Sequence, residues 1–252
     1  MAQGKLFQIQ RLPQFRESDA DGRIGLRGYM NCFQDAATHY MHDLGLGNDT
    51  LPERFGTCWV FTKYKLRLFR KADFTAPLQL ECWVEQEKRR PSIRLTQDLE
   101  ISRAGELCAC GRLEECLMEL PAGKFRRLSD IGFPLEAALD RQVEVEPFAR
   151  VRNPDLEDLE DRGRHTVCYT DLDKSGHMNN LRYVEVLLNA FDSRFWAEHF
   201  PTDFEIHYLS QCYEGEVLTV RRRVTETGAE VWVVKADGTA AAAGLFRFGT
   251  EQ

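Results

Sequence analysis

YTDLDKSGHMNNLRYVEVLLNAF, residues 169–191, joins a polar turn to an apolar helical pattern without a break. The turn contains two aspartates, a histidine and two asparagines. The apolar residues that follow have the three- and four-residue spacing of one helical face. The polar residues are therefore predicted to stand immediately before a helix. The residues of this face are Tyr183, Val184, Leu187, Ala190 and Phe191.

The same plan occurs earlier in the chain, in FRESDADGRIGLRGYMNCFQDAATHYMHDLGLG, residues 15–47. An offset of 152 residues aligns its Asp-x-Asp turn, residues 19–21, with residues 171–173. A gap of two residues then aligns Tyr29 with Tyr183. The chain is therefore predicted to contain two copies of a short strand, a polar turn and a helix. Gly45 follows the last apolar residue of the first helix and is predicted to terminate it.

Segments of alternating apolar and polar residues follow each helix, at residues 58–120 and 204–249. This alternation predicts antiparallel strands with one face to bury, and a helix lying along the sheet would cover that face. The fold is therefore predicted to be α+β with two tandem units, residues 1–145 and 146–252, and an irregular connection over residues 121–164. Turns are predicted at residues 71–73, 103–105, 214–215, 227–228 and 237–238.

Composition excludes several classes of function. The 252 residues have 43% hydrophobic content, enough for a packed core, and a net charge of −7, which argues against broad nucleic-acid binding. No apolar run reaches the ~20 residues of a membrane span. The eight cysteines show no zinc-ligand spacing, so we expect buried thiols in a cytoplasmic protein with no metal and no cofactor.

The turn DLDKSGHMNN, taken with YLSQCYEGE at residues 208–216, resembles the acyl-acyl carrier protein (acyl-ACP) thioesterases. This resemblance implies two tandem hot-dog units, each an antiparallel sheet wrapped around a long central helix. It also implies hydrolysis of acyl-ACP to free fatty acid, ending fatty acid chain elongation, with acyl carrier protein as partner and a homodimer left open. The first copy, DADGRIGLRGY, resembles the non-catalytic half of the family, which shapes the acyl pocket.

Thioester hydrolysis needs a base or nucleophile and hydrogen-bond donors for the developing oxyanion. The resemblance implies Asp173 as base or nucleophile, and His177 as the group that polarises the carbonyl or orients Asp173. Backbone N–H groups at the helix start are expected to help hold the oxyanion. Ser175 and Gln211 become auxiliary hydrogen-bonding residues, although the family usually has asparagine and glutamate at these positions.

Several alternatives remain open from the sequence alone. Asp and Asn before a helix are ordinary N-capping residues, and Asp171 is expected to cap or brace the turn. Cys212 is expected to be a packed thiol rather than a nucleophile. The alternative functions are an acyl-CoA thioesterase and a non-catalytic acyl-thioester-binding sensor.

Two further groups of residues are predicted to contact substrate or partner. A stripe on the first helix is expected to line the acyl slot or simply to pack in the core. Basic residues on the strands are expected to face an acidic carrier protein or only solvent. The stripe is Met30, Phe33, Ala37, Tyr40 and Met41, and the carrier-binding residues are Arg89, Arg90 and Arg222.

His39 and His42, one turn apart, are expected to lie on a solvated helix face.

Overall fold

The computed structural model describes residues 4–86, 93–120, 122–152 and 155–252. The chain divides into two compact units, Met1–Glu146 (unit 1) and Pro147–Gln252 (unit 2). Within the described ranges, no helix is long and apolar enough to cross a membrane.

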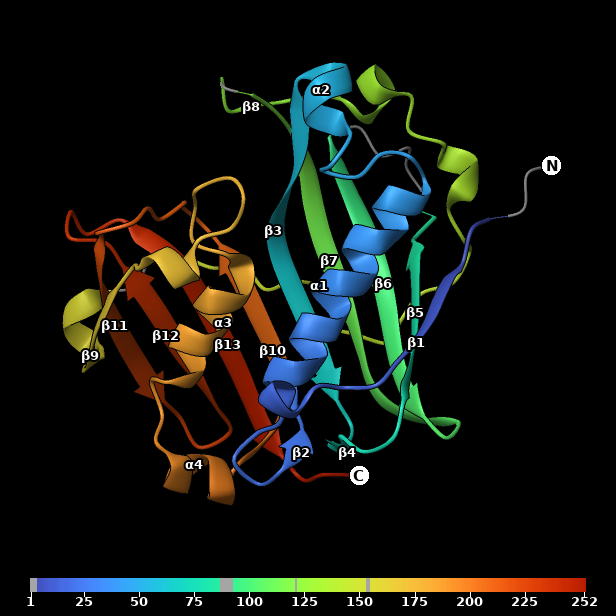
Figure 1. Ribbon diagram of the computed structural model, residues 1–252. Helices are drawn as coiled ribbons and strands as arrows, with labels where there is room; N and C mark the ends of the chain where they lie inside the picture. The colour runs from blue at the N-terminus through green and yellow to red at the C-terminus, as the bar shows by residue number, and fades with distance from the viewer. Residues whose placement is uncertain (1–3, 87–92, 121, 153–154) are drawn as a thin grey trace. The chain divides into compact units, whose positions relative to one another are not determined.

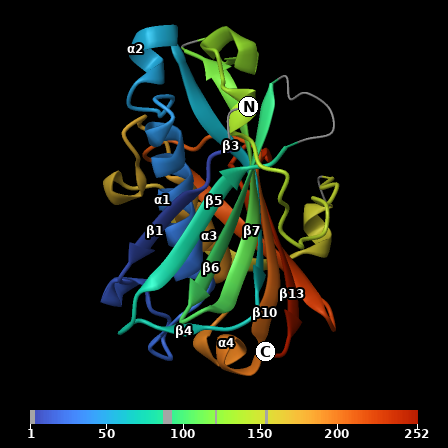
Figure 2. The same ribbon diagram turned by 90° about the vertical axis from the view of Figure 1, so that its right-hand side faces the viewer.

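Unit 1 is an antiparallel sheet with one long helix, α1 (Leu26–Asp43), along one face (Figure 1). Figure 2 shows β5, β6 and β7 side by side with α1 along one side of them. The strand order is β1-β5-β6-β7-β3, and a short strand β8 pairs with β7. The strands are β1 (Phe7–Arg11), β3 (Thr57–Leu68), β5 (Leu78–Val84), β6 (Arg94–Arg103), β7 (Glu106–Glu119) and β8 (Lys124–Phe125).

Shorter elements complete unit 1. Strands β2 and β4 form a separate two-stranded sheet. The predicted turn at residues 71–73 is wrong, because residues 72–73 form β4 and the chain turns at residues 74–76. The elements are β2 (Arg23–Ile24), β4 (Ala72–Asp73), α2 (Leu51–Phe55), and the 3-10 helices η1 (Phe15–Glu17), η2 (Leu128–Ile131) and η3 (Leu135–Ala137).

Unit 2 repeats this design with the strand order β10-β13-β12-β11-β9, so the predicted α+β class is confirmed. Its first strand begins at Glu160, inside the segment predicted to be irregular. The elements are β9 (Glu160–Thr166), β10 (Phe200–Tyr208), β11 (Val217–Val224), β12 (Gly228–Val234), β13 (Ala240–Gly249), α3 (Asn180–Leu188), α4 (Ser193–Glu198), η4 (Leu156–Asp158) and η5 (Tyr169–Asp171).

The helix of unit 2 is interrupted, whereas a single long helix was predicted. It ends at Leu188 and resumes as α4 at Ser193. Asp192 explains the restart, because its side chain accepts a hydrogen bond from the N–H of Phe195 at 2.8 Å and so caps a new helix.

The two copies of the polar turn correspond at an offset different from the predicted one. The N–H of Asp19 donates to the C=O of Arg23 at 2.8 Å, and the N–H of Asp173 donates to the C=O of His177 at 2.9 Å. These two bonds, and the starts of α1 and α3, lie 154 residues apart. The predicted offset of 152 residues in the turn is therefore wrong, and Asp173 corresponds to Asp19 rather than to Asp21.

In each unit a glycine lets the helix approach the sheet. A Cβ atom added to Gly111 on β7 would lie 2.6 Å from the ring of Phe33 on α1. A Cβ atom added to Gly244 on β13 would lie 2.7 Å from Leu187 on α3. Phe33 and Leu187 are themselves 154 residues apart, so the same helix position meets a glycine in both units.

A buried polar group lies on the inner face of the sheet of unit 1. The side-chain amide of Gln97 donates to Glu115 Oε1 at 2.6 Å, and the thiol of Cys82 donates to Gln97 Oε1 at 3.2 Å. Burial raises the pKa of Glu115 to about 8, although the bond from Gln97 opposes this rise. The folded protein therefore carries a neutral carboxyl group in this core at neutral pH.

Glu115→Gln tests this protonation state. The folded pKa of Glu115 lies above that of an unfolded glutamate, about 4.3. The folded state therefore holds a proton that the unfolded state releases, and wild-type stability falls as pH rises from there to about 8. We expect the variant to gain on wild type over this range by up to about 1.4 kcal/mol per pH unit. Urea unfolding of both proteins across the range measures this, and Glu119→Gln on the same strand is the control. A difference that stays constant with pH would contradict the assignment.

Candidate active site

The turn between η5 and α3 presents the carboxylate of Asp173 to solvent. Asp173 Oδ1 accepts the N–H of Ser175 at 2.7 Å, and the C=O of Asp173 accepts the N–H of Gly176 at 3.0 Å. Gly176 has φ +75°, a left-handed conformation that glycine adopts without strain. These contacts place Asp173, Ser175 and His177 on one tight turn, as the sequence predicts.

The loop between β10 and β11 lies against this turn and brings Gln211 to it. The N–H of Met178 donates to the C=O of Cys212 at 2.9 Å. The ring of Tyr213 meets the His177 imidazole edge-on, with 4.9 Å between ring centroids. The hydroxyl of Tyr213 donates to Gln211 Oε1 at 3.4 Å. All four predicted catalytic residues therefore lie in one region of unit 2.

Tyr213 was not identified from the sequence as a site residue. It lies in the segment YLSQCYEGE two residues after Gln211, but nothing in that spacing indicates a contact with an imidazole. Its N–H donates to Glu216 Oε2 at 3.0 Å, and Glu216 Oε1 lies 3.2 Å from Lys235 Nζ. These contacts hold Tyr213 in place beside the imidazole of His177.

Glu216 does not replace the glutamate that the family usually has at position 211. Burial acts to raise the pKa of Glu216, but the N–H of Tyr213 and the ammonium of Lys235 hold it below its usual range. The carboxylate is therefore ionised and already bonded. Cys212 is buried, and burial raises the pKa of its thiol, as expected for a packed thiol rather than a nucleophile.

Most backbone donors at the start of α3 are already used. The N–H of Asn179 donates to the C=O of Asp171 at 2.8 Å, and the side chain of Asn179 caps the helix by accepting the N–H of Leu181 at 2.9 Å. The N–H of Met178 is bonded to the neighbouring loop. These bonded groups are therefore not available to hold an oxyanion, and the His177 imidazole is a side-chain donor at the turn that can take this role.

The equivalent turn in unit 1 is neutralised. Lys71 Nζ lies 2.8 Å from Asp19 Oδ2 and 3.1 Å from Asp21 Oδ2, and Arg23 occupies the position of His177. Among the residues that the structure describes, Asp173 makes no ion pair. Only the turn of unit 2 therefore combines an unpaired carboxylate with an imidazole.

The predicted acyl stripe on α1 lies in the core of unit 1. Its five residues are each at most 2% exposed, and the ring of Phe33 stacks on that of Tyr64 with 6.0 Å between centroids. The stripe therefore packs between α1 and the sheet.

Of the three basic residues predicted to bind a carrier, the structure describes Arg222. Arg89 and Arg90 lie outside the described residues. Arg222 Nε lies 2.8 Å from Glu160 Oε2, and its Nη1 donates to the C=O of Ala190 at 2.7 Å. The charge of Arg222 is therefore engaged within unit 2.

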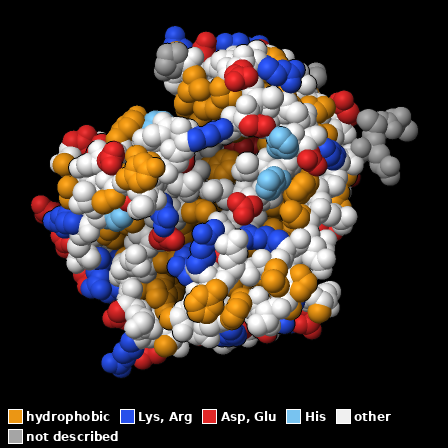
Figure 3. Space-filling model, viewed as in Figure 1, with side chains coloured by type: hydrophobic (Ala, Val, Ile, Leu, Met, Phe, Trp, Pro, Cys, Tyr) orange, Lys and Arg blue, Asp and Glu red, His pale blue; other side chains and the backbone are white. Residues whose placement is uncertain are grey.

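The two histidines of α1 are exposed, as expected, and His42 Nδ1 lies 2.8 Å from Asp49 Oδ2. Figure 3 shows pale blue histidines beside red acidic side chains where α1 runs. No cluster of three or more His, Cys, Asp or Glu residues able to hold a metal ion is found in the described parts of the chain.

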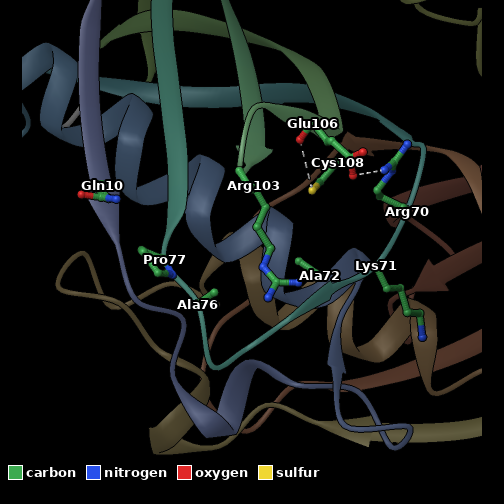
Figure 4. A pocket seen from close by; sticks show the side chains of 10 residues that line it. Gln10, Arg70, Lys71, Ala72, Ala76, Pro77, Arg103, Glu106 and Cys108 are labelled. Carbon is green, nitrogen blue, oxygen red and sulfur yellow. Dashed lines mark hydrogen bonds and ion pairs between the residues drawn. The ribbon is translucent and has the colours of Figure 1, made fainter.

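A pocket of about 370 Å³ lies elsewhere in unit 1 and contains none of the predicted site residues (Figure 4). Three basic side chains contribute to its wall, and each is already paired with an acidic one. Arg70 pairs with Glu106, and Arg103 Nη2 lies 3.5 Å from Asp73 Oδ2. The third, Lys71, binds the unit 1 turn, so the pocket has little free positive charge.

Family models match most of the chain. The model of the acyl-ACP thioesterase N-terminal domain matches residues 4–107, and that of the acyl-ACP thioesterase C-terminal domain matches residues 156–243. A palmitoyl-acyl carrier protein thioesterase of Gossypium hirsutum is 24% identical over 85% of this chain and 54% of its own length. A dodecanoyl-[acyl-carrier-protein] hydrolase of Umbellularia californica is 22% identical over 86% of this chain and 59% of its own length. The chain thus spans about half the length of the curated relatives it matches.

Solved structures share the fold over nearly the whole chain. An acyl-ACP thioesterase from Bacteroides thetaiotaomicron has a TM-score of 0.85 at 20% identity, covering 97% of this chain and 98% of its own. The 12:0-ACP thioesterase from Umbellularia californica has a TM-score of 0.81 at 17% identity, covering 97% of both chains. These likenesses confirm the predicted tandem hot-dog fold.

Gly176→Ala tests the geometry of the turn. Alanine in a left-handed conformation costs about 1 kcal/mol, and nothing crowds an added Cβ, so strain alone should lower the free energy of unfolding by that amount. Gly22, with φ +78°, is the matched position in unit 1, and Gly22→Ala should cost the same. Urea unfolding measures both variants, and an unchanged stability in either would contradict the equivalence of the two turns.

Proposed function

Because the chain belongs to the acyl-ACP thioesterase family, we propose that it is an enzyme that hydrolyses acyl-ACP and releases free fatty acid. One observation supports this most directly: Asp173 is exposed and unpaired among the described residues, on the same turn as His177, while its counterpart Asp19 is neutralised by Lys71. A binding protein without turnover would gain nothing from this difference.

In the proposed reaction, Asp173 acts as base or nucleophile. As a base it takes a proton from a water molecule, which attacks the thioester carbonyl carbon. The imidazole of His177 donates a hydrogen bond to the carbonyl oxygen as it becomes negative, and the thiolate then leaves with the electron pair of the carbon–sulfur bond. Ser175 and Gln211 hold the attacking water or the carboxylate by single hydrogen bonds.

We assign the reaction to unit 2 and the acyl chain to unit 1. The stripe on α1 combines Ala37 with larger apolar side chains, and a fatty acyl chain needs an apolar slot of this kind. The stripe is packed against the sheet, so the acyl chain would bind by opening this core between helix and sheet.

We propose the cytoplasm as the location and acyl carrier protein as the partner that delivers the substrate. No disulfide joins any of the eight cysteines, all of which lie within the described ranges, as expected in a reducing compartment. An acyl-CoA donor remains the alternative, and a panel of thioesters on both carriers distinguishes them. Absence of hydrolysis across this panel would contradict the proposed function.

Substitutions in the turn should rank the roles of its residues. Asp173→Asn should reduce turnover by about 10²–10⁴-fold, the usual loss for a general base. His177→Ala should cost about 10²–10³-fold, the usual loss when one oxyanion donor is removed. Ser175→Ala should cost about tenfold, equivalent to one hydrogen bond.

Gln211→Glu is the control in the same series and should leave turnover equal or higher, since it introduces the usual residue of the family. Steady-state kinetics on one acyl-thioester gives all four values. Near-normal hydrolysis by a folded Asp173→Asn protein would place the base elsewhere.

Ala37→Trp tests the proposed acyl slot. A large ring in the middle of the stripe should fill part of the slot and shift the preferred chain length downward. Thr38→Trp is the control, because Thr38 is the next residue of α1 and points to solvent. Comparing hydrolysis across acyl chain lengths measures the shift. A folded Ala37→Trp protein with the wild-type profile would show that the stripe is ordinary core.

A further inference from the structure

Asp171 holds together the two ends of the turn that carries Asp173. It is 8% exposed, and its Oδ2 accepts the N–H of Cys168 at 2.9 Å and lies 3.0 Å from Nε2 of His165 on β9. Its backbone C=O accepts the N–H of Asn179, the N-cap of α3, at 2.8 Å. This single residue therefore ties the edge strand of unit 2 to the start of the helix, and the reactive carboxylate lies between these two attachments.

We call the side-chain contact of Asp171 with His165 and with the N–H of Cys168 the brace. Unit 1 contains the same brace at the offset of 154 residues, made from different side chains. Glu17 stands in the place of Asp171, and Arg11 in the place of His165. Glu17 is 5% exposed, its Oε1 lies 2.6 Å from Arg11 Nη2, and its Oε2 accepts the N–H of Gln14 at 2.7 Å. A buried acid that bonds to the edge strand and caps a 3-10 helix is thus present in both units.

The brace affects the reaction because the carboxylate of Asp173 is held only from within its own turn, among the described residues. Its carboxylate is exposed, and the one hydrogen bond it accepts among the described residues comes from Ser175, inside the same turn. The direction of the carboxylate therefore follows the position of the turn, which is set by the bonds of Asp171 and by the bond of Met178 to the neighbouring loop. Arg182 adds little, since its Nε lies 4.0 Å from Asp171 Oδ1 and its Nη1 lies 2.5 Å from Glu185 Oε2.

We propose that Asp171 and His165 are positioning residues for the reaction: they touch no substrate, and they hold the turn so that Asp173 and His177 face the thioester together. This inference rests on the proposed function. A misplacement of about 1 Å in a reacting group can reduce turnover by as much as about 100-fold. Loss of the brace should therefore lower kcat while leaving substrate binding, which we assign to unit 1, unchanged.

The experiment compares four variants in steady-state hydrolysis of one acyl-thioester, each assayed below its unfolding temperature. His165→Ala removes the contact of β9 with Asp171, Asp171→Asn removes the charge of the carboxylate, and His165→Arg/Asp171→Glu transplants the complete pair of unit 1. Arg11→Ala is the matched control, because it removes the same brace from unit 1. We expect kcat to fall about tenfold in the first two, with KM changed by less than about twofold. The transplanted pair should restore kcat to within about threefold of wild type, and Arg11→Ala should lose stability but keep kcat.

Three results would overturn the inference. The first is a kcat near the wild-type value in His165→Ala and Asp171→Asn. The second is a kcat of the transplanted pair no higher than that of the single variants. The third is a loss of kcat in Arg11→Ala equal to that in the unit 2 variants. If His165→Ala does not fold, the isosteric Asp171→Asn carries the comparison. Wild-type protein that hydrolyses no acyl-thioester would overturn the proposed function as well. An active wild type whose brace variants keep the wild-type kcat would overturn the inference alone.

Discussion

The contact on which each unit depends is the meeting of its helix with one glycine of its sheet, Phe33 over Gly111 and Leu187 over Gly244. No side chain fits between helix and strand at these points, so the distance of the helix from the sheet is fixed there. The polar turn leads directly into the same helix. The position of the proposed catalytic residues at the N-terminus of α3 therefore depends on a packing contact about two turns further along the helix.

The two copies of the polar turn differ in their charges rather than in their backbone. Hydrogen bonds close both turns in the same way, and both have a glycine in the left-handed conformation at the same place. In unit 1 Lys71 binds both aspartates of the turn, which makes it a neutral structural element. In the described part of unit 2 no lysine pairs with Asp173, and an imidazole replaces Arg23. The reactivity that we propose for Asp173 thus depends on removing a counter-charge rather than on building a new turn.

The helices, the strand runs and the polar turn were predictable, because periodicity and turn residues report local structure directly. The offset between the copies was not, because matching the letters of two Asp-x-Asp motifs hides that Glu17 and Asp171 have the same role. Strand β9 was missed because its side chains are mostly exposed, which leaves no apolar alternation to read. The contact of Tyr213 with His177 joins two loops across 36 residues, and no local pattern reports such a contact.

The pairing of the strands has a consequence for how the chain is made. In unit 1 the edge strand β1 pairs with β5, so that Phe7 lies opposite Cys82, and the intervening chain must be synthesised before the sheet can close. Such distant pairings make closure slow compared with helix formation. All the main strands of unit 1 precede residue 120, so its sheet can assemble during translation while unit 2 is still being synthesised. The half assigned to acyl binding is thus complete before the residues that would cleave the thioester emerge from the ribosome.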